Sequence, residues 1–568
     1  MAADGTELFE PPEGLIDDIA TIPLDDEASY KLYASAKTVA VFQVESSGMM
    51  DALKRMKPTC IEDIVALVAL YRPGPMENIP TYCEVKNGQR EIESVHPSID
   101  YLLAETQGII VYQEQVMQIA QVMAGYSLGG ADLLRRAMGK KIAEEMAKER
   151  PKFEKGAMEN GVDKKKASEV FDLLEKFANY GFNKSHAAAY AVVSYQTAWL
   201  KANHPVEFMA GVMNCDIHLT DKLAVYFEEV RKRLELPWVP PCVNRSDATF
   251  KVVEGALVYA LGALKNVGVE AMKLITEGRK VDGVDKPFAT LFDLARRVDL
   301  KRVGKRPLEM LARSGAFDQL DNNRRRVWQS LDGLVSYSAA IHEQKASNQV
   351  SLFGEAGDDL PEPRIVPCDD WEAAERLTEE FKAVGFYLSG HPLDDYMGPM
   401  KRKSATGGVP FLTLDELTEK VSVKGAMNAR LAGIVAGRQE RKSARGNRFA
   451  FAQLSDPTGA YEVTLFSDTL ELARDHLETG SKVVVMVEAT MESDQLKLLG
   501  RSVVPIDTVV EDAGNMGLRI FVDDAGAIQA VADVLAGARS AARSAGKGPV
   551  QLCLMDPTLP GEVEVDLC

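Results

Sequence analysis

The chain has 568 residues with a formal net charge of −18 at neutral pH, and 46% of its residues are hydrophobic and 26% charged. This length exceeds what one hydrophobic core supports, so we expect three or more domains. The composition is typical of a globular protein and excludes a disordered one. The acidic balance argues against nucleic-acid binding over the whole surface but leaves room for a local basic groove.

No apolar run is long enough to cross a bilayer, and the acidic start at Met1 lacks the apolar region of a signal peptide. We therefore expect a cytoplasmic protein. The 7 cysteines contain no Cys-x-x-Cys pair, and the 7 histidines show no metal-ligand spacing. We therefore predict that the cysteines are reduced and that neither the cysteines nor the histidines form a metal site.

Residues from about 30 to 226 show a mostly helical pattern. Apolar side chains three and four apart predict one buried helix face at Val116, Ile119 and Met123. Further helices are expected at 167–177 and 187–201. Proline-rich connections come next at 237–241 and 361–367, the second in an acidic stretch typical of a linker.

After about residue 422 the hydrophobic period changes to two, which predicts β-strands. Five strands are expected at 431–435, 449–454, 461–466, 482–487 and 495–499. The last segment predicts a strand, a helix and a strand at 518–522, 525–536 and 550–554.

A first cluster of cations lies at Arg135, Arg136, Lys140 and Lys141. In a helix, Arg136 and Lys140 are four residues apart and share a face. Guanidinium groups beside lysines suit a polyphosphate anion. The alternative is a solvated basic helix end, which the helix dipole favours.

A second cluster, residues 180–190, places Lys184 and His186 after a turn that contains glycine and asparagine. Ser185 is a candidate N-cap of the helix after this turn. A lysine and a histidine beside a helix N-terminus form an anion site. The alternative is an ordinary cap with two exposed polar side chains.

Two shorter motifs precede these clusters. Arg72-Pro73-Gly74-Pro75 predicts a rigid turn. The run from Tyr112 to Gln115 is expected on a helix surface.

Segments 41–46, 72–75, 112–118, 134–141 and 181–190 succeed one another in an order that resembles the fingers region of the bacterial DNA polymerase III alpha subunit, a C-family replicative polymerase. The resemblance extends over nearly the whole chain and is strongest from about residue 19 to 213. It implies fingers that close over an incoming dNTP. In that family, basic fingers residues neutralise charge on the triphosphate; the matching positions here are Arg135, Arg136, Lys140, Lys184 and His186.

The resemblance also implies Mg²⁺ for polymerase activity, held by clustered carboxylates of a palm segment that precedes the fingers. None of the acidic pairs in this sequence stands in a strand-like apolar frame of the palm kind. We therefore expect the catalytic aspartates to be absent from this chain, so that polymerisation needs a palm from elsewhere. The alternative functions are a non-enzymatic DNA-binding or clamp-tethering protein, or a truncated product.

Residues 259–270 resemble a helix-hairpin-helix motif, which implies contacts from Lys265, Asn266 and Gly268 to the phosphates of primer-template DNA. Asn266 replaces the usual first glycine, a tolerable change because asparagine accepts a positive φ. From 296 to 326 there are ten Arg or Lys against four Asp or Glu, and Arg324 and Arg325 are candidate DNA contacts. A tight turn between two helices is the alternative.

The pentapeptide Gln349 to Phe353 resembles the segment that binds the beta sliding clamp. Leu352 and Phe353 would enter an apolar pocket while Gln349 fixes the register. The alternative is an apolar stretch packed on its own domain.

The five-strand region resembles an OB-fold whose first loop carries the candidate DNA-binding residues Arg438, Arg441, Lys442 and Arg445. Phe449 and Phe451 share one strand face, either as a stacking surface for single-stranded DNA or as barrel core. The region after 508 resembles part of the family's domain for the clamp-loader tau subunit, so the expected partners include the replicase holoenzyme.

Taken together, these elements predict a multidomain α+β protein with mainly helical fingers and helix-hairpin-helix domains, then a β-barrel OB-fold and a small α/β C-terminal domain. The expected boundaries are 1–225 for the fingers, 226–345 for the helix-hairpin-helix domain, 346–354 for the clamp peptide, 355–425 for a linker and helical connection, 426–507 for the OB-fold and 508–568 for the partial C-terminal domain.

Overall fold

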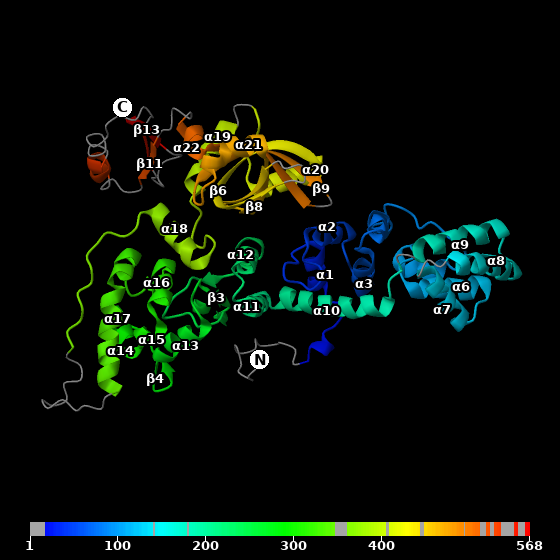
Figure 1. Cartoon of the computed structure of the whole chain (residues 1–568), viewed down its shortest axis with the longest axis horizontal. Helices are drawn as coiled ribbons and strands as arrows, with labels where there is room; N and C mark the ends of the chain where they lie inside the picture. The colour runs from blue at the N-terminus through cyan, green and yellow to red at the C-terminus, as the bar shows by residue number, and fades with distance from the viewer. Residues whose placement is uncertain are drawn as a thin grey trace. The chain divides into compact units, whose positions relative to one another are not determined.

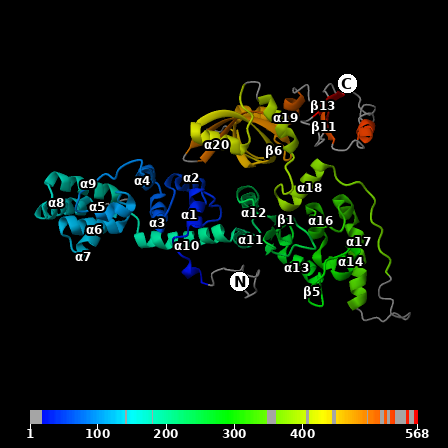
Figure 2. The same ribbon diagram turned by 180° about the vertical axis from the view of Figure 1, so that it is seen from behind.

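The structure, a computed structural model, describes residues 18–567 apart from 140–142, 179–180, 347–359, 405–407, 443–447, 493–494, 512–517, 523–527, 535–549 and 555–562. The chain forms two compact units, Met1–Leu388 and Ser389–Cys568 (Figure 1; Figure 2 gives the reverse view). The described helices and strands confirm the predicted multidomain α+β class.

The first hydrophobic core of unit one lies between α1 (Glu27–Ala34), α2 (Ser47–Met56), α3 (Ile61–Leu70) and α10 (Lys184–Asn203). Helix α10 packs against α1 and α3 (Figure 1). Its 20 residues correspond to about 30 Å. Helix α10 therefore links the first core to α11 (Pro205–Cys215), which begins directly after it in the chain.

The second core lies between α6 (Gln113–Ala124), α7 (Leu128–Gly139), α8 (Ala143–Glu159) and α9 (Lys164–Ala178). The predicted face of Val116, Ile119 and Met123 is buried here, as expected. The predicted helices at 167–177 and 187–201 lie within α9 and α10. Gly156 lets α8 approach α6, because a Cβ at that position would lie 2.2 Å from the Ala124 carbonyl oxygen.

The third core of unit one is mainly helical, with a small sheet ordered β1–β3–β2. Its helices are α11, α12 (Thr220–Glu228), α13 (Val269–Gly278), α14 (Leu291–Arg297), α15 (Leu300–Val303), α16 (Lys305–Ser314) and α17 (Arg324–Ala346). The strands are β1 (Trp238–Val239), β2 (Lys251–Val253) and β3 (Ala256–Val258).

Part of the segment expected as one connection, 355–425, belongs to this third core. Ser330 Oγ accepts from the Val366 amide at 3.0 Å, and the Trp371 ring lies 6.2 Å from that of Trp328. Helix α18 (Ala373–Val384) packs on α16. Apolar and aromatic side chains thus bind residues 365–384 of the segment predicted as a linker and helical connection to unit one.

Unit two contains a closed barrel with the strand order β10–β8–β7–β6–β9. Its strands are β6 (Ala426–Lys442), β7 (Arg448–Asp456), β8 (Gly459–Phe466), β9 (Lys482–Glu492) and β10 (Gln495–Pro505). Strands β8 and β10 pair in parallel, and α21 (Ser467–Ala473) connects β8 to β9. This arrangement confirms the predicted OB-fold, and each predicted strand lies within an observed one.

The end of unit two forms a sheet ordered β11–β12–β13. Strands β11 (Leu518–Val522) and β12 (Val550–Leu554) are parallel, and β13 (Val563–Leu567) is antiparallel to β12. Residues 528–534 are helical, so the predicted strand, helix and strand are present. In the described part of the chain, no helix is both long and apolar enough to span a membrane.

Candidate nucleotide and nucleic-acid interfaces

The start of α10 lies against the start of α6, and this contact brings two sequence motifs together. The Gln113 amide donates to the Phe182 carbonyl at 2.9 Å, and the Phe182 amide donates to the Val111 carbonyl at 3.2 Å. Gly181 fits closely here, because a Cβ would lie 3.1 Å from Gln113 Cγ. Residues 112–118 and 181–190 are therefore neighbours.

The polar run Gln113 to Gln115 makes this contact, and the expectation of a helix surface is wrong for Gln115. Gln115 is 2% exposed, and its Oε1 accepts from the Val111 and Tyr112 amides at 2.8 and 2.9 Å. Glu114 accepts from the Lys184 amide at 3.0 Å. Backbone amides need a hydrogen-bond acceptor when they are buried. Gln115 and Glu114 supply the acceptors for the amides of Val111, Tyr112 and Lys184.

The N-cap of α10 is Asn183 rather than the expected Ser185. Asn183 Oδ1 accepts from the His186 amide at 2.9 Å, and α10 begins at Lys184. Ser185 lies in the first turn of the helix. Asparagine and serine cap equally well, so composition alone does not choose between them.

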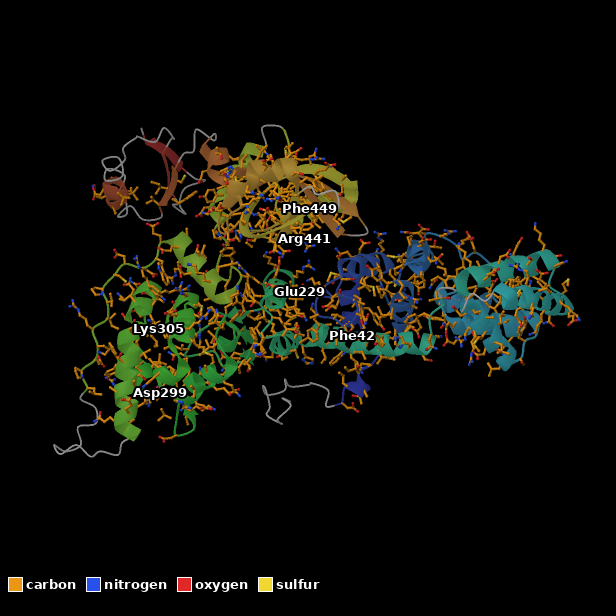
Figure 3. The ribbon with its side chains drawn as sticks, viewed as in Figure 1. Phe42, Glu229, Asp299, Lys305, Arg441 and Phe449 are labelled. Atoms are coloured by element: carbon orange, nitrogen blue, oxygen red, sulfur yellow. The ribbon has the colours of Figure 1, made fainter. Side chains whose placement is uncertain are left out.

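A row of stacked side chains, here called the aromatic row, runs over this surface. The Arg72 guanidinium lies 4.3 Å from the centroid of the Phe182 ring. Ring centroids are then 5.4 Å apart from Phe182 to His186, 4.6 Å from His186 to Tyr190, and 5.4 Å from Tyr190 to Phe42. Phe42 is labelled beside α10 in Figure 3. The row unites the motifs at 41–46, 72–75 and 181–190.

The predicted cations of α7 reach the same place through Gln113. Arg135 Nη1 donates to Gln113 Oε1 at 3.0 Å, and Gln113 Nε2 donates to the Gly181 carbonyl at 3.1 Å. Arg135 and Arg136 both pair with Asp132, at 2.7 and 2.8 Å. The hydrogen bond from Arg135 lowers the pKa of the Asp132 carboxyl.

Lys184 also has an acidic partner, since its Nζ lies 2.7 Å from Glu105 Oε1. Its ammonium is 5.4 Å from the centroid of the Tyr112 ring. The structure thus gathers Arg135, Lys184 and His186 around the start of α10, and Arg136 shares the Asp132 carboxylate with Arg135. The fifth predicted cation, Lys140, lies outside the described residues.

The other end of α10 is fixed by a fully buried ion pair. Lys201 Nζ lies 2.7 Å from Glu229 Oε1, the two side chains are 0% and 1% exposed, and Nζ also donates to the Val39 carbonyl at 2.7 Å. Burial lowers the pKa of Lys201, and the carboxylate opposes that effect. Glu229, labelled in Figure 3, begins a π-helical turn, Glu229–Arg233.

The predicted helix-hairpin-helix turn lies between η5 (Leu261–Ala263) and α13. Asn266 has φ +60°, as expected for asparagine at a glycine position. Gly268 caps α13 with φ −93°, so it has no need of glycine's conformational freedom. Lys265 is half-buried against α18, where its ammonium lies 5.7 Å from the Phe381 ring centroid.

Arg324 is part of the protein interior, which contradicts a phosphate contact. It is 9% exposed and pairs with Asp318 at 2.9 Å and Glu380 at 3.2 Å. The second of these pairs joins α17 to α18. Arg325 is half-buried, and its amide donates to Asp370 Oδ1 at 3.1 Å.

A second basic turn, which the sequence motifs did not single out, joins α15 to α16 at Gly304. Gly304 has φ +94° and is flanked by exposed cations. These are Lys301, Arg302, Lys305 and Arg306. Asp299 caps α15, and Lys305 pairs with Asp332 at 2.7 Å (both Asp299 and Lys305 are labelled in Figure 3). The excess of Arg and Lys over Asp and Glu in residues 296–326 was the sequence feature that could have indicated this turn.

The outer face of the OB barrel carries an aromatic cluster. Inward residues of β7 such as Ala450 and Ala452 are buried, whereas Phe449 and Phe451 are only half-buried on the opposite face. The alternative that they form the barrel core is therefore wrong. Phe449 pairs across the strands with Phe466, which is 56% exposed and was missed by sequence reasoning.

Basic side chains border this cluster. The Arg441 guanidinium lies 5.4 Å from the Phe451 ring centroid (Figure 3 labels Arg441 and Phe449), and Lys442 is exposed. Arg438 pairs with Glu440 at 3.3 Å. Arg445 lies outside the described residues.

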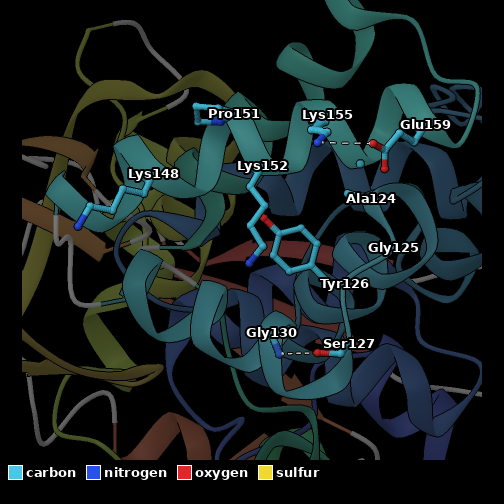
Figure 4. Close-up of a pocket in the computed structure, with 11 residues that line it drawn as sticks. Ala124, Gly125, Tyr126, Ser127, Gly130, Lys148, Pro151, Lys152, Lys155 and Glu159 are labelled. Atoms are coloured by element: carbon cyan, nitrogen blue, oxygen red, sulfur yellow. Dashed lines mark hydrogen bonds and ion pairs between the residues drawn. The ribbon is translucent and has the colours of Figure 1, made fainter.

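No group of three or more His, Cys, Asp or Glu side chains that could hold a metal ion occurs among the described residues. A hollow of about 590 Å³ lies between α8 and the α6–α7 turn (Figure 4). Its lining includes Lys148, Lys152 and Lys155 but no residue of the five motifs. The predicted clamp peptide with Gln349, Leu352 and Phe353 lies outside the described residues.

Comparisons with known proteins assign two segments of the chain to known families. Residues 6–161 match the family described as the bacterial DNA polymerase III alpha subunit finger domain, and residues 235–327 match the helix-hairpin-helix motif. The chain is thus a multidomain protein with a polymerase finger domain and a helix-hairpin-helix domain. It belongs to the bacterial DNA polymerase III alpha subunit family.

The relatives extend over most of this chain. The DNA polymerase III subunit alpha of Caulobacter vibrioides is 46% identical over 510 residues, covering 90% of this chain and 44% of the relative. The subunit of Escherichia coli K12 is 42% identical over 527 residues, covering 91% and 44%. The chain therefore spans less than half the length of these relatives.

Two solved structures resemble 14% of the chain. They are a mitochondrial single-stranded DNA-binding protein of S. cerevisiae (21% identical, 92% of that chain covered, TM-score 0.13) and the second OB-fold domain of replication protein A from Methanococcus maripaludis (19%, 85%, TM-score 0.12). The strand order of the barrel, and not these similarities, carries the OB-fold assignment.

Changing Lys201 to Met is expected to destabilise unit one by about 3–5 kcal/mol, because the buried Glu229 carboxylate loses its partner at 2.7 Å and keeps only the more distant Arg233, at 3.7 Å. The matched control is Lys31→Met, which removes an exposed pair with Glu27 and is expected to cost about 1 kcal/mol or less. Urea unfolding, combined with hydrogen exchange of the α10 amides, measures the loss of stability in each of the two variants. Equal effects of the two substitutions would contradict the role assigned to the buried pair.

Proposed function

We propose that the chain supplies the nucleotide-gripping and DNA-binding part of a replicative DNA polymerase, which adds dNTPs under template direction. The convergence of all five motifs at the start of α10 carries this proposal. Arg135, Arg136, Lys184 and His186, with Lys140, bind the triphosphate and neutralise charge on the leaving pyrophosphate. The exposed rings of Phe42 and Tyr190 lie beside them as a stacking surface.

Polymerases of this family use Mg²⁺ to activate the primer hydroxyl and stabilise the leaving group. The described residues hold no cluster of ligands for it. We propose that the metal-binding aspartates come from outside this chain, and that the cations around α10 hold the dNTP against them.

The isolated chain is accordingly expected to give no primer extension with primer-template DNA, dNTPs and Mg²⁺, while still binding the DNA. Extension is measured on a sequencing gel and DNA binding by fluorescence anisotropy. A complete alpha subunit from a relative serves as the positive control. Mg²⁺-dependent extension by the isolated chain would show that it carries its own catalytic carboxylates.

The helix-hairpin-helix domain is proposed to hold the duplex of the primer-template by its phosphates. The hairpin at Asn266 and Gly268 presents backbone N–H groups, and Arg302 and Arg306 add exposed cations at the second turn. Lys265 and Arg325 are half-buried and are proposed to contribute less to DNA binding. Arg324 is buried and is not part of the proposed DNA contact.

The OB barrel is proposed to bind the single-stranded template on its outer face. Phe449, Phe451 and Phe466 offer rings on β7 and β8, on the face where OB-folds bind oligonucleotides. Arg441 and Lys442, together with Arg438 and Arg445, supply phosphate contacts.

Changing Phe451 or Phe466 to Ala is expected to weaken oligo-dT binding by roughly 5- to 100-fold, since stacking of one base contributes about 1–3 kcal/mol. Leu472→Ala, which removes another exposed apolar side chain of the same unit, is the matched control. Fluorescence anisotropy with oligo-dT and with duplex DNA measures the affinity of these variants and of the control for each ligand. A loss confined to duplex binding, or an equal loss in the control, would contradict the assignment.

Gln349, Leu352 and Phe353 remain a predicted beta-clamp peptide, and residues 508–568 a predicted contact with the tau subunit and the replicase holoenzyme. Leu352→Ala with Phe353→Ala is expected to abolish clamp binding, because the apolar anchors of the peptide are lost. Calorimetry with the purified clamp checks this. Unchanged affinity would mean that the clamp docks elsewhere.

A non-enzymatic DNA or clamp tether is the second candidate. Exposed basic turns and the OB face suit both functions. The aromatic row and the cations gathered beside it favour the polymerase function, because a tether has no need of a triphosphate site. Binding of dNTP by Arg135 and His186 separates the two.

A further inference from the structure

Each described arginine or lysine of the proposed triphosphate site is paired with a carboxylate of the chain itself. Asp132 uses both oxygens, Oδ1 for Arg135 and Oδ2 for Arg136. Glu105 uses both oxygens for Lys184, at 2.7 and 2.8 Å. These three cations therefore already share two carboxylates in this structure.

A third carboxylate occupies the beginning of α10. Glu114 Oε2 accepts from the Lys184 amide at 3.0 Å, and its Oε1 accepts from the Asn183 side chain at 2.9 Å. The N-terminal end of a helix is where a phosphate group binds favourably. Three carboxylates from three elements thus lie where a triphosphate would bring its charges.

The pairs made by Asp132 and Glu105 differ in kind from the buried pairs elsewhere in unit one. The Lys184 and Glu105 side chains are 41% and 37% exposed, and Arg136 is 62% exposed. Arg135 and Asp132 are less exposed, at 28% and 29%. Water screens the exposed pairs, so each of these stabilises the fold only weakly and exchanges readily. The Lys201–Glu229 pair, at 0% and 1% exposure, is not exchangeable in this way.

We propose that Asp132 and Glu105 are specificity-determining counter-ions, which hold the cations until a triphosphate displaces them. This inference rests on the proposed triphosphate site. An anion displaces the carboxylates only if its interaction with Arg135, Arg136 and Lys184 is more favourable than the ion pairs that the carboxylates already make. A triphosphate meets this condition because its several charges reach all three cations, whereas orthophosphate is too small to span them. The carboxylates set a threshold that rejects weakly charged phosphates.

The test is calorimetric titration of the full chain with tripolyphosphate and with orthophosphate at low ionic strength. Asp132→Asn is expected to tighten tripolyphosphate binding by about two- to fivefold, and Glu105→Gln by a similar factor. Both are expected to raise orthophosphate binding by a larger factor, because the carboxylates act mainly against the weakly charged anion. Asp132→Glu keeps the charge and should match the original chain.

Glu154→Gln removes one charge from α8, outside this site, and controls for net charge. Arg135→Ala separates the two levels of the argument. If Arg135→Ala leaves tripolyphosphate binding unchanged, the proposed triphosphate site itself fails. If Arg135→Ala weakens binding but Asp132→Asn matches the original chain or Glu154→Gln, only the counter-ion inference fails. Weaker binding by Asp132→Asn, or no binding by any variant, also overturns it.

Discussion

The buried ion pair between Lys201 and Glu229 constrains the structure on which the proposed sites depend. Removing two charges from water is costly, and their close approach, the hydrogen bond to the Val39 carbonyl and the Arg233 guanidinium 3.7 Å from Glu229 offset that cost. A shift of α10 would leave one charge buried without a partner. The end of α10 is therefore fixed where the first core of unit one meets the π-helical turn at Glu229.

Helix α10 transmits this constraint to its other end. Its middle packs against α1 and α3, where Tyr195 is fully buried, and its start carries His186 and Tyr190 of the aromatic row. Polar side chains of α6 then hold the first turn in place. The proposed nucleotide-binding surface is thus built around a helix anchored at both ends, which limits how far Lys184, His186 and Tyr190 can move.

Charge in this acidic chain is used in two physically different ways. Buried pairs, such as Lys201 with Glu229 and Arg324 with Glu380, join helical elements. Exposed pairs, such as Lys184 with Glu105, are held weakly and lie at the start of α10. The net charge of −18 hides this division, because a local cation balanced by a nearby carboxylate contributes nothing to the sum.

Periodicity in the sequence determined the element types and the faces they bury. The period-two runs predicted the OB strands, the Val116 face predicted the core of α6, and Asn266 was expected to accept a positive φ. Only the tertiary structure decided the partners of each charge and ring: Asn183 rather than Ser185 caps α10, Arg324 is buried, and Phe466 joins Phe449. The reason is physical, since a local pattern reports which side of an element avoids water but not which distant residue lies against it.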